Sequence, residues 1–381
     1  MKYREFGKTG WKSSVLGFGA MRLPTIGGDP SKIDEPLAIE MIRYAVDHGV
    51  NYVDTAWPYH GGRSEVVVGK ALEEGYREKV RLATKMPTWL VEEEGDFDRF
   101  LGEQLKRLGV DKIDFYLLHG LNKSRWPKLK ELGVFDWAEG ALEEGRIGHL
   151  GFSFHDEYNV FEDILRDSDR FAFCQIQLNY VDSDYQAGVR GMRLAHGKGL
   201  AVVVMEPIKG GKLALPPPRE VGEIWARAPV RRPLAEWALQ WVWNHPEVSV
   251  ALSGMSNMRH VVENLEYADR SGAGSLSEEE LALIEEVREA YSRAGFVGCT
   301  GCRYCMPCPS GVAIPEVLEL YNEYFMSGRS EAVKEKYWEV VSEEENARHC
   351  VACGACEEKC PQGLPIRRLM SEASRIFARR G

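Results

Sequence analysis

Short apolar runs alternate with helical patterns through the first three quarters of the chain. Most of these runs are nearly continuous, as expected for parallel strands that are covered on both faces. Helical stripes lie between them, for example in 36–49 and 233–245. Eight strand–helix units predict an α/β fold, a closed (β/α)8 TIM barrel. The predicted strands are 15–21, 51–54, 80–84, 113–119, 149–153, 173–179, 201–206 and 248–254.

Segments outside this repeat divide the chain further. Residues 3–13 precede the first strand and predict a hairpin that closes the bottom of the barrel. The segment 207–232 is long for a barrel loop, and long loops on the active rim tend to hold ligands. Ser277 and Glu280 form a capping-box pattern that begins a helix. The predicted parts are a barrel over 1–270, a linker helix over 271–298 and a small helical domain over 299–381.

Composition narrows the class of protein. With 44% hydrophobic and 28% charged residues, the chain is globular, and its net charge of -10 argues against a nucleic-acid surface. The first residues lack the apolar region of a signal peptide, and no run is long enough to span a membrane. We therefore predict a cytoplasmic protein. Eight of the nine cysteines lie in the last quarter, which indicates metal ligation in a reducing compartment.

Four polar residues stand at the ends of predicted strands. Asp54 follows NYV, Lys85 ends VRLATK, His119 ends DFYLLH, and Tyr59 lies in the loop after Asp54. Such strand ends share one rim of a barrel, where active sites are built. An ammonium near a tyrosine lowers the phenol pKa from about 10, and a histidine can bond a substrate oxygen. Each residue alone is most simply structural, but the four together predict proton donation to a carbonyl oxygen.

The segments around these residues resemble the aldo-keto reductase family over about residues 1–265. DTAWPYHGGRSE, which begins at Asp54, is similar to the family's Asp-x4-Tyr segment, and ATK and LLH are similar to its lysine and histidine segments. The resemblance implies that Tyr59 is the general acid, that Lys85 lowers its pKa and that Asp54 pairs with Lys85. It implies that His119 orients the carbonyl of an aldehyde or ketone during reduction, or the alcohol in the reverse reaction.

The resemblance also implies a nicotinamide cofactor, NADP(H) or NAD(H), with a preference for NADPH. GFS at 151–153 is similar to the family's Gly-x-Ser segment, with Phe154 at the position of the usual Asn. Met205 stands where the family often stacks a tyrosine, and Arg259 and Lys212 are candidates for the cations of NADP-preferring members. No GxGxxG predicts a Rossmann site. The candidate cofactor residues are Ser153, Gln175, Met205, Gly254, Ser256, Arg259, Glu263 and Asn264.

Eight cysteines form two runs, CxxCxxCxxCP from Cys299 and CxxCxxCxxxCP from Cys350. The second run has the spacing of bacterial ferredoxins, in which the fourth cysteine ligates the other cluster. We therefore predict two [4Fe–4S] clusters. Two zinc sites of four thiolates each are the alternative, less consistent with the Cys-Pro endings. One predicted ligand set is Cys299, Cys302, Cys305 and Cys360, and the other is Cys308, Cys350, Cys353 and Cys356.

The segment between the two cysteine runs, 309–349, has a helical pattern that begins at Ile314. The whole module resembles the helical ferredoxin modules that are fused to reductases. Its last segment is basic, which indicates either a solvated face or a docking surface for an acidic, ferredoxin-like electron carrier. The basic residues are Arg367, Arg368, Arg375, Arg379 and Arg380.

The sequence is compatible with three functions. The first is an NAD(P)H-dependent carbonyl reductase whose clusters exchange electrons with a partner. Hydride carries two electrons and a cluster accepts one; a flavin that would separate them is compatible with the sequence, but no segment specifies its site. The second is an ordinary reductase with structural or redox-sensing clusters. The third is a non-enzymatic redox-sensing barrel subunit, against which the four rim residues argue.

Overall fold

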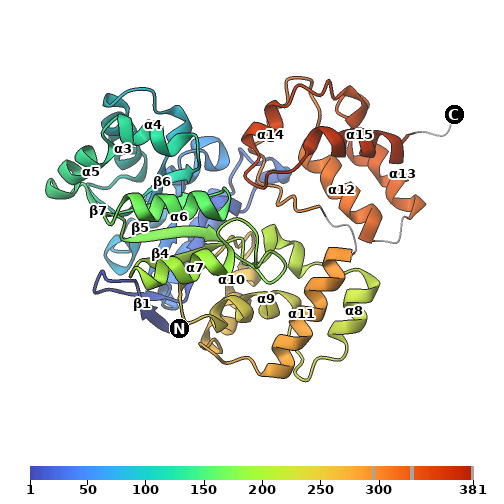
Figure 1. Ribbon diagram of the computed structural model, residues 1–381, viewed down its shortest axis with the longest axis horizontal. Coiled ribbons are helices and arrows are strands. Elements are labelled where there is room, and N and C mark those ends of the chain that lie inside the picture. The colour runs from blue at the N-terminus through green and yellow to red at the C-terminus, as the bar shows by residue number, and fades with distance from the viewer. Residues whose placement is uncertain (294–296, 327–329, 379–381) are drawn as a thin grey trace. The chain divides into compact units, whose positions relative to one another are not determined.

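The computed structural model describes residues 1–293, 297–326 and 330–378 (Figure 1). By their contacts, the residues form two compact units. The first unit is Met1–Pro207 with Glu236–Leu276, and the second is Ile208–Ala235 with Ser277–Gly381. The segment after the seventh predicted strand therefore belongs to the second unit. The sequence-based limits at 270 and 298 stay predictions.

The first unit contains a closed barrel of eight parallel strands, which confirms the predicted (β/α)8 fold (Figure 1). Around the barrel the order is β10, β3, β4, β5, β6, β7, β8, β9. The strands are β3 (Leu16–Gly19), β4 (Tyr52–Asp54), β5 (Arg81–Met86), β6 (Ile113–Leu121), β7 (Ile147–Phe154), β8 (Phe173–Gln177), β9 (Ala201–Met205) and β10 (Val248–Ser253). Every residue of β6 is buried, as its unbroken apolar run requires when helices cover one face and side chains fill the other.

A short hairpin closes the bottom of the barrel. β1 (Tyr3–Glu5) pairs antiparallel with β2 (Lys12–Ser14), as the sequence predicts. Phe6, in the turn between them, is fully buried, and its ring centroid lies 4.4 Å from that of Phe115 inside the barrel. Gly7 has φ +54°, and a Cβ there would lie 2.5 Å from the backbone nitrogen of Ala201. The hairpin backbone therefore packs directly against the first residue of β9.

Helices of the first unit alternate with the strands and surround them (Figure 1). The first begins after Asp34, whose carboxylate accepts a hydrogen bond from the Leu37 amide at 3.3 Å. The helices are α1 (Glu35–Asp47), α2 (Ser64–Ala71), α3 (Gly95–Leu108), α4 (Arg125–Glu131), α5 (Val134–Glu143), α6 (Tyr158–Asp167), α7 (Gly188–Gly197), α9 (Leu234–Asn244), which begins just before this unit's second segment, and α10 (Met258–Asp269).

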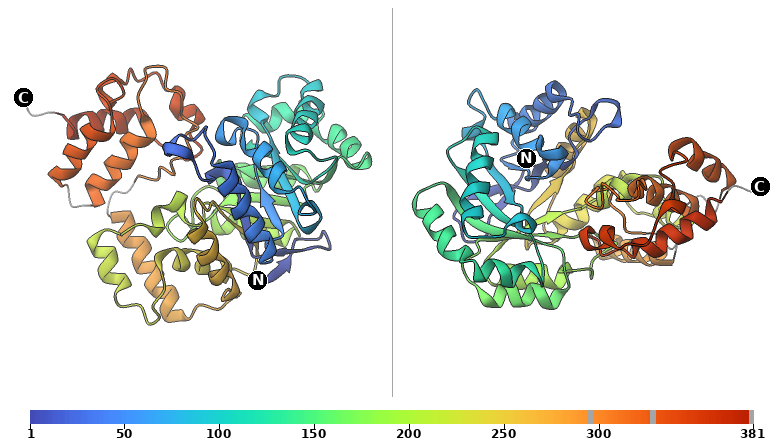
Figure 2. Two further views of the ribbon diagram at one scale, coloured as in Figure 1. Left: turned by 180° about the vertical axis from the view of Figure 1, so that it is seen from behind. Right: turned by 90° about the horizontal axis from the view of Figure 1, so that it is seen from above.

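The second unit is helical. Its helices are α8 (Arg219–Trp225), α11 (Glu278–Arg293), α12 (Ile314–Met326), α13 (Glu331–Val340), α14 (Ala355–Lys359) and α15 (Ile366–Ile376). The predicted capping box begins α11: the Glu280 amide donates to the Ser277 hydroxyl at 3.2 Å, and the Ser277 amide donates to the Glu280 carboxylate at 2.8 Å. α12 packs against α13 and α15 (Figure 2). Tyr337 and Phe377 stack in this core with ring centroids 4.2 Å apart.

The basic last segment is described only in part, because Arg379 and Arg380 lie outside the described residues. Two of the other arginines there are paired: Arg367 lies 2.7 Å from Glu357, and Arg368 lies 3.6 Å from Glu372. Among the described helices, none has the length and apolar character needed to cross a membrane.

Phe6→Ala tests the role of the hairpin. The substitution removes a fully buried ring from the bottom of the barrel, so we expect the free energy of unfolding to fall by about 3–5 kcal/mol. Chemical denaturation followed by tryptophan fluorescence measures this. Tyr3→Ala, at a side chain that is 48% exposed in the same hairpin, is the control and should change the free energy of unfolding far less. Equal effects of the two substitutions would contradict the plug.

Candidate active site and cysteine sites

A buried ion pair lies at the carboxyl ends of two neighbouring strands. Lys85 of β5 is fully buried, and its Nζ donates to Asp54 Oδ1 at 2.5 Å and to the backbone oxygen of Thr55 at 2.7 Å. Asp54 ends β4, which pairs with β5. The structure therefore brings these two predicted residues together. The Thr55 carbonyl is a third member that side-chain patterns do not reveal.

The other two rim residues lie beside this pair. Tyr59 begins a short 3-10 segment (Tyr59–Gly62) after β4 and is buried. The Lys85 ammonium lies 5.0 Å from the centroid of the Tyr59 ring. The His119 ring, on β6, lies 6.2 Å from the Tyr59 ring at an interplanar angle of 87°. All four predicted catalytic residues thus meet at one rim of the barrel.

Burial and pairing act in opposite directions on the ion pair. Burial raises the pKa of Asp54 and lowers the pKa of Lys85, whereas the attraction between the two charges opposes both shifts. Within the described structure, Asp54 Oδ2 is buried without a hydrogen-bond partner. Each charge is therefore stabilised mainly by the other, and loss of either side chain would leave its partner buried and uncompensated.

His119 is held in its neutral form. Burial lowers its pKa well below 6.5, and the positive charges of Lys85 and Arg125 add to this shift. A neutral imidazole has one N–H donor, which suits a hydrogen bond to a carbonyl oxygen. Trp89 lies beside it with ring centroids 5.1 Å apart and is 39% exposed. The sequence analysis missed Trp89, although an exposed tryptophan after a barrel strand is a signal for a substrate wall.

A second histidine at this rim was also missed. His155 directly follows β7, and its Nδ1 lies 3.2 Å from Gln186 Oε1. Burial lowers the pKa of His155 to about 4, and His155 is near enough to His119 to affect its pKa. The strand-end rule that selects His119 selects His155 as well, so the signal was present in the sequence.

A buried polar network fixes the strand that carries Lys85. Glu65 is fully buried, and its Oε1 accepts hydrogen bonds from Thr84 Oγ1 at 2.7 Å and Gln104 Nε2 at 2.6 Å. The same Gln104 nitrogen donates to the Lys85 backbone oxygen at 3.1 Å. Tyr116 donates to Gln104 Oε1 at 2.7 Å. Because its hydrogen bonds are satisfied, this network fixes the backbone of β5 at Thr84 and Lys85.

Two of the candidate cofactor residues are paired across neighbouring strands. Ser153 of β7 stands opposite Gln175 of β8 in register. Gln175 Oε1 is buried and, among the described residues, has no hydrogen-bond partner, while its Nε2 lies 3.8 Å from the Met205 sulfur. The Ser153 oxygen accepts from the Gly120 amide at 2.8 Å, which leaves its O–H able to donate. An orphaned amide oxygen beside a hydroxyl donor fits the nicotinamide carboxamide, which carries both a donor and an acceptor.

The remaining candidate cofactor residues lie near the beginning of α10. Ser256 Oγ is 3.4 Å from a ring nitrogen of His260, and Asn264 Nδ2 donates to Ser253 Oγ at 2.8 Å. Arg259 lies 3.4 Å from Glu263 and its side chain is 78% exposed. A helix start with an exposed cation suits a phosphate group.

Two further residues, Gly254 and Lys212, were candidates for the phosphate-binding segment. Gly254 follows β10, and a Cβ there would lie 3.2 Å from the Arg22 side chain, which is a tight contact. Lys212, the other candidate cation, lies 3.6 Å from Glu319 within the second unit. The structure therefore gives Lys212 a protein partner in that unit.

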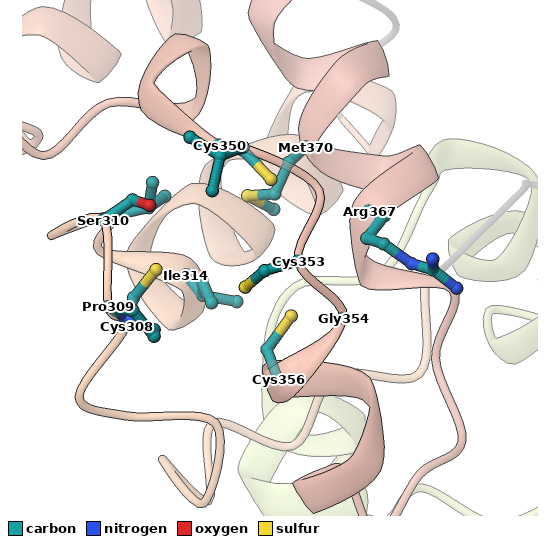
Figure 3. A pocket seen from close by; sticks show the side chains of 12 residues that line it. Cys308, Pro309, Ser310, Ile314, Cys350, Cys353, Gly354, Cys356, Arg367 and Met370 are labelled. Carbon is teal, nitrogen blue, oxygen red and sulfur yellow. The ribbon is translucent and has the colours of Figure 1, made fainter.

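The structure brings the cysteines together in two groups. Four of them line one pocket, here called the second cysteine site (Figure 3). It consists of Cys308, Cys350, Cys353 and Cys356. Cys353 is exposed, and the neighbouring Val351 is 69% exposed. This site therefore reaches the surface of the second unit.

The first cysteine site consists of Cys299, Cys302, Cys305 and Cys360. Burial raises the pKa of Cys305 to about 12, and the other three thiols contribute to that shift, so all four are close. Burial also raises the pKa of Cys299, whereas the positive charge of Lys212 lowers it. The two groups match the crossed ligand sets that the ferredoxin spacing predicts. Among the described residues, no three His, Cys, Asp or Glu side chains lie close enough together to hold one single metal ion, so the two cysteine groups are wider than a single-ion site.

A closed (β/α)8 barrel with polar side chains gathered at the carboxyl ends of its strands is the architecture of a large class of enzymes. The family model described as the aldo/keto reductase family matches residues 15–289, so the chain belongs to this family. A model described as a 4Fe-4S dicluster domain matches residues 298–364. The family and the C-terminal iron–sulfur domain predicted from the sequence are thereby confirmed, and the chain is an enzyme of the reductase class.

Several known proteins are similar to this chain over part of its length. An NADH-specific methylglyoxal reductase of Escherichia coli is 26% identical over 347 residues, which cover 77% of this chain and all of that protein. A probable aldo-keto reductase of Glycine max is 34% identical over 157 residues, only 39% of this chain and 44% of that protein. The holo form of aldo-keto reductase AKR11C1 from Bacillus halodurans superimposes with a TM-score of 0.63 at 28% identity, covering 75% of this chain and 96% of that one. A Klebsiella pneumoniae aldo-keto reductase in complex with NADPH gives 0.61 at 25% identity, covering 75% and 95%.

His155 makes stability at the rim depend on pH. The unfolded chain binds a proton below pH 6.5, whereas the folded imidazole excludes it down to about pH 4. We expect the free energy of unfolding to fall as pH drops through this window, by at most ~1.4 kcal/mol per pH unit. Urea unfolding at several pH values should show a shallower pH dependence for His155→Asn. The exposed control His196→Asn should retain the slope of the unsubstituted protein. An unchanged slope in His155→Asn would contradict the assignment.

Proposed function

We propose that this protein reduces an aldehyde or ketone with NADPH or NADH, or catalyses the reverse reaction, with Tyr59 as general acid. The observation that carries the proposal is the fully buried Lys85, bonded to Asp54 at 2.5 Å and 5.0 Å from the ring of Tyr59. A buried ammonium fixed beside a phenol has a direct use in proton transfer and a poor justification as a purely structural feature.

Each rim residue has one task in this reaction. The neutral His119 donates a hydrogen bond to the carbonyl oxygen and so orients it. Tyr59 gives its phenolic proton to that oxygen, and Lys85 favours the phenolate that remains. Asp54 holds the ammonium in place. A bound nicotinamide supplies the hydride for the carbonyl carbon; in the reverse direction the Tyr59 oxygen accepts the alcohol proton.

The cofactor proposal follows the same strand ends. Ser153 and Gln175 would bind the carboxamide of a nicotinamide, and Met205, beside Gln175, would contact its ring. The segment at the start of α10 binds the phosphates, with Arg259 as the exposed cation. We favour NADPH over NADH because of this cation. Among similar proteins, one is an NADH-specific reductase and another is known in complex with NADPH. The phosphate-side residues are Gly254, Ser256, Arg259, Glu263 and Asn264.

We also propose that the two cysteine sites each hold a [4Fe–4S] cluster. Support comes from the dicluster domain match, from the ferredoxin spacing of the second run and from the crossed grouping of the thiols. The alternative is zinc at both sites, and measuring the iron and zinc content of the purified protein distinguishes the two. Eight thiols kept reduced for ligation favour a cytoplasmic location.

The second cysteine site is the proposed exchange point for electrons. Its exposed edge, formed by Val351 and Cys353, gives a partner short access to the cluster. We propose a small one-electron carrier of the ferredoxin type as that partner, since such complexes are typically small and transient.

One observation favours a second candidate function, in which the clusters are structural or sense redox state. Hydride transfers two electrons together, each cluster accepts one, and no segment of the sequence specifies a flavin to separate them. The deciding experiment adds NADPH or NADH anaerobically to the iron-loaded protein and follows absorbance and EPR, with dithionite as the reference. Cluster reduction by the nicotinamide would support one electron path and the presence of a mediator. Reduction by dithionite alone would assign the clusters a separate donor or one of these other roles.

Tyr59→Phe tests the general acid. Removal of one hydroxyl should lower kcat for aldehyde reduction by about 10²–10⁴-fold while the affinity for NADPH, measured by fluorescence titration, stays within a few-fold. Tyr52→Phe is the matched control, because Tyr52 is a fully buried tyrosine in the lower barrel core and lies outside the rim. Full activity of Tyr59→Phe would refute the assignment.

Cys353→Ser tests the second cysteine site. The variant should lose about half of the bound iron if two clusters are present, as measured by iron analysis after anaerobic reconstitution. Cys174→Ser is the control, because Cys174 is buried in β8 away from both cysteine sites in the sequence and should keep its full iron content. Unchanged iron, or stoichiometric zinc in the unsubstituted protein, would rule out this cluster.

A further inference from the structure

We propose that Lys209 and Lys212 form a positively charged wall beside the first cysteine site and raise the reduction potential of its cluster. Both lysines lie in a 3-10 segment, Lys209–Ala214, that follows β9 in the chain but belongs to the second unit together with the cysteines. The inference rests on the proposed two clusters and goes beyond the carbonyl-reductase function.

Lys209 is placed against the backbone that leads into the site. It is only 3% exposed, and its Nζ lies 3.4 Å from the position that a Cβ on Gly298 would occupy. Gly298 immediately precedes Cys299, the first residue of this ligand set.

The backbone at Lys209 supports this reading. Lys209 has φ +49°, a left-handed conformation that is uncommon for a residue with a side chain. Gly210 and Gly211 follow it with φ +64° and +91°. Such conformations persist where the surroundings over-determine them, and they concentrate at functional sites. The turn delivers a long cationic side chain to a buried position beside a predicted ligand.

Lys212 acts on the same cysteine. Its side chain is 14% exposed, and its ammonium interacts electrostatically with Cys299. Glu319, 3.6 Å from this ammonium, opposes it, but that carboxylate is 64% exposed and is therefore screened by water more strongly. Arg303, in the same cysteine run, is paired with Glu316 and adds little net charge. Across this group, the two lysines are the cations with the least exposure.

A nearby cation changes the potential through charge alone. A [4Fe–4S] cluster with four thiolates becomes more negative when it accepts one electron, and cluster potentials depend on local charge and solvent exposure. A buried ammonium favours the reduced form by Coulomb attraction that water screens weakly. No bond is made or broken, and the electron comes from the external reductant. The segment after β9 thereby tunes a centre whose ligands come from residues 299–360.

The test is a redox titration with dithionite of the full-length, iron-loaded protein, followed by EPR. Lys212→Gln should lower the ratio of reduced to oxidised first cluster by about tenfold at a fixed potential, which is about 59 mV for one electron. Lys212→Arg should retain the potential. Lys336→Gln, which removes an equal charge from α13, is the matched control. The EPR signal retained in Cys353→Ser identifies the first cluster. Lys209→Gln should add a further shift of the same sign.

The measured potentials of the two clusters decide the proposal. A shift confined to the first cluster in Lys212→Gln supports the proposal. Unchanged potentials in Lys212→Gln, or equal shifts of both clusters in Lys212→Gln and Lys336→Gln, would overturn it. Iron analysis of the same samples distinguishes a failure of the premise: fewer than about eight iron atoms per chain in the unsubstituted protein rejects the two-cluster proposal. Because Lys212 is less buried than Lys209, its variant tests the inference even if Lys209→Gln does not fold.

Discussion

The Lys85 ammonium is buried, and the groups that contact it offset the free-energy cost of removing its charge from water. A buried charge is costly unless it has a counter-charge and hydrogen bonds, and Asp54 and the Thr55 carbonyl provide both. That arrangement requires two adjacent parallel strands that end at the same level, which β4 and β5 supply. Phe6 closes the barrel from below, at the end opposite to the proposed active site.

The same interaction explains the protonation states across the site. Burial is the main cause that lowers the pKa of His119, and the Lys85 ammonium, which water screens only weakly, acts in the same direction. One rim therefore holds a cationic lysine, an anionic aspartate and a neutral imidazole within a small volume. These environments, rather than the residue types alone, support the proposed division of roles between proton donor and orienting group.

Site residues that belong to a local pattern in the sequence could be predicted, and those that depend on packing between distant segments could not. Asp54, Lys85 and His119 were predictable because each ends an apolar run, and a parallel barrel collects such ends on one rim. Trp89 follows β5 and His155 follows β7, so both could have been found by the same rule. The contact between Glu65 and Gln104 could not, since it joins two helices whose facing positions depend on packing. The place of Lys212 beside Glu319 in the second unit could not be predicted, because a long loop carries no periodic signal for the unit to which it belongs.

The second unit is built from two separate stretches of chain, Ile208–Ala235 and Ser277–Gly381. α8 of the first stretch packs against α11 of the second, and Val221, Ile224 and Trp225 of α8 are buried. The iron–sulfur part is therefore not an appendage that can be cut off at one peptide bond. A protein truncated after α11 would keep the packing of α8 on α11 but would lose Gly298, which lies beside Lys209. One expressed from α11 onward would lack α8 together with Lys209 and Lys212. The loss of activity in either fragment would report a damaged fold as readily as a missing redox centre, so the two chemistries must be separated by point substitutions in the intact chain.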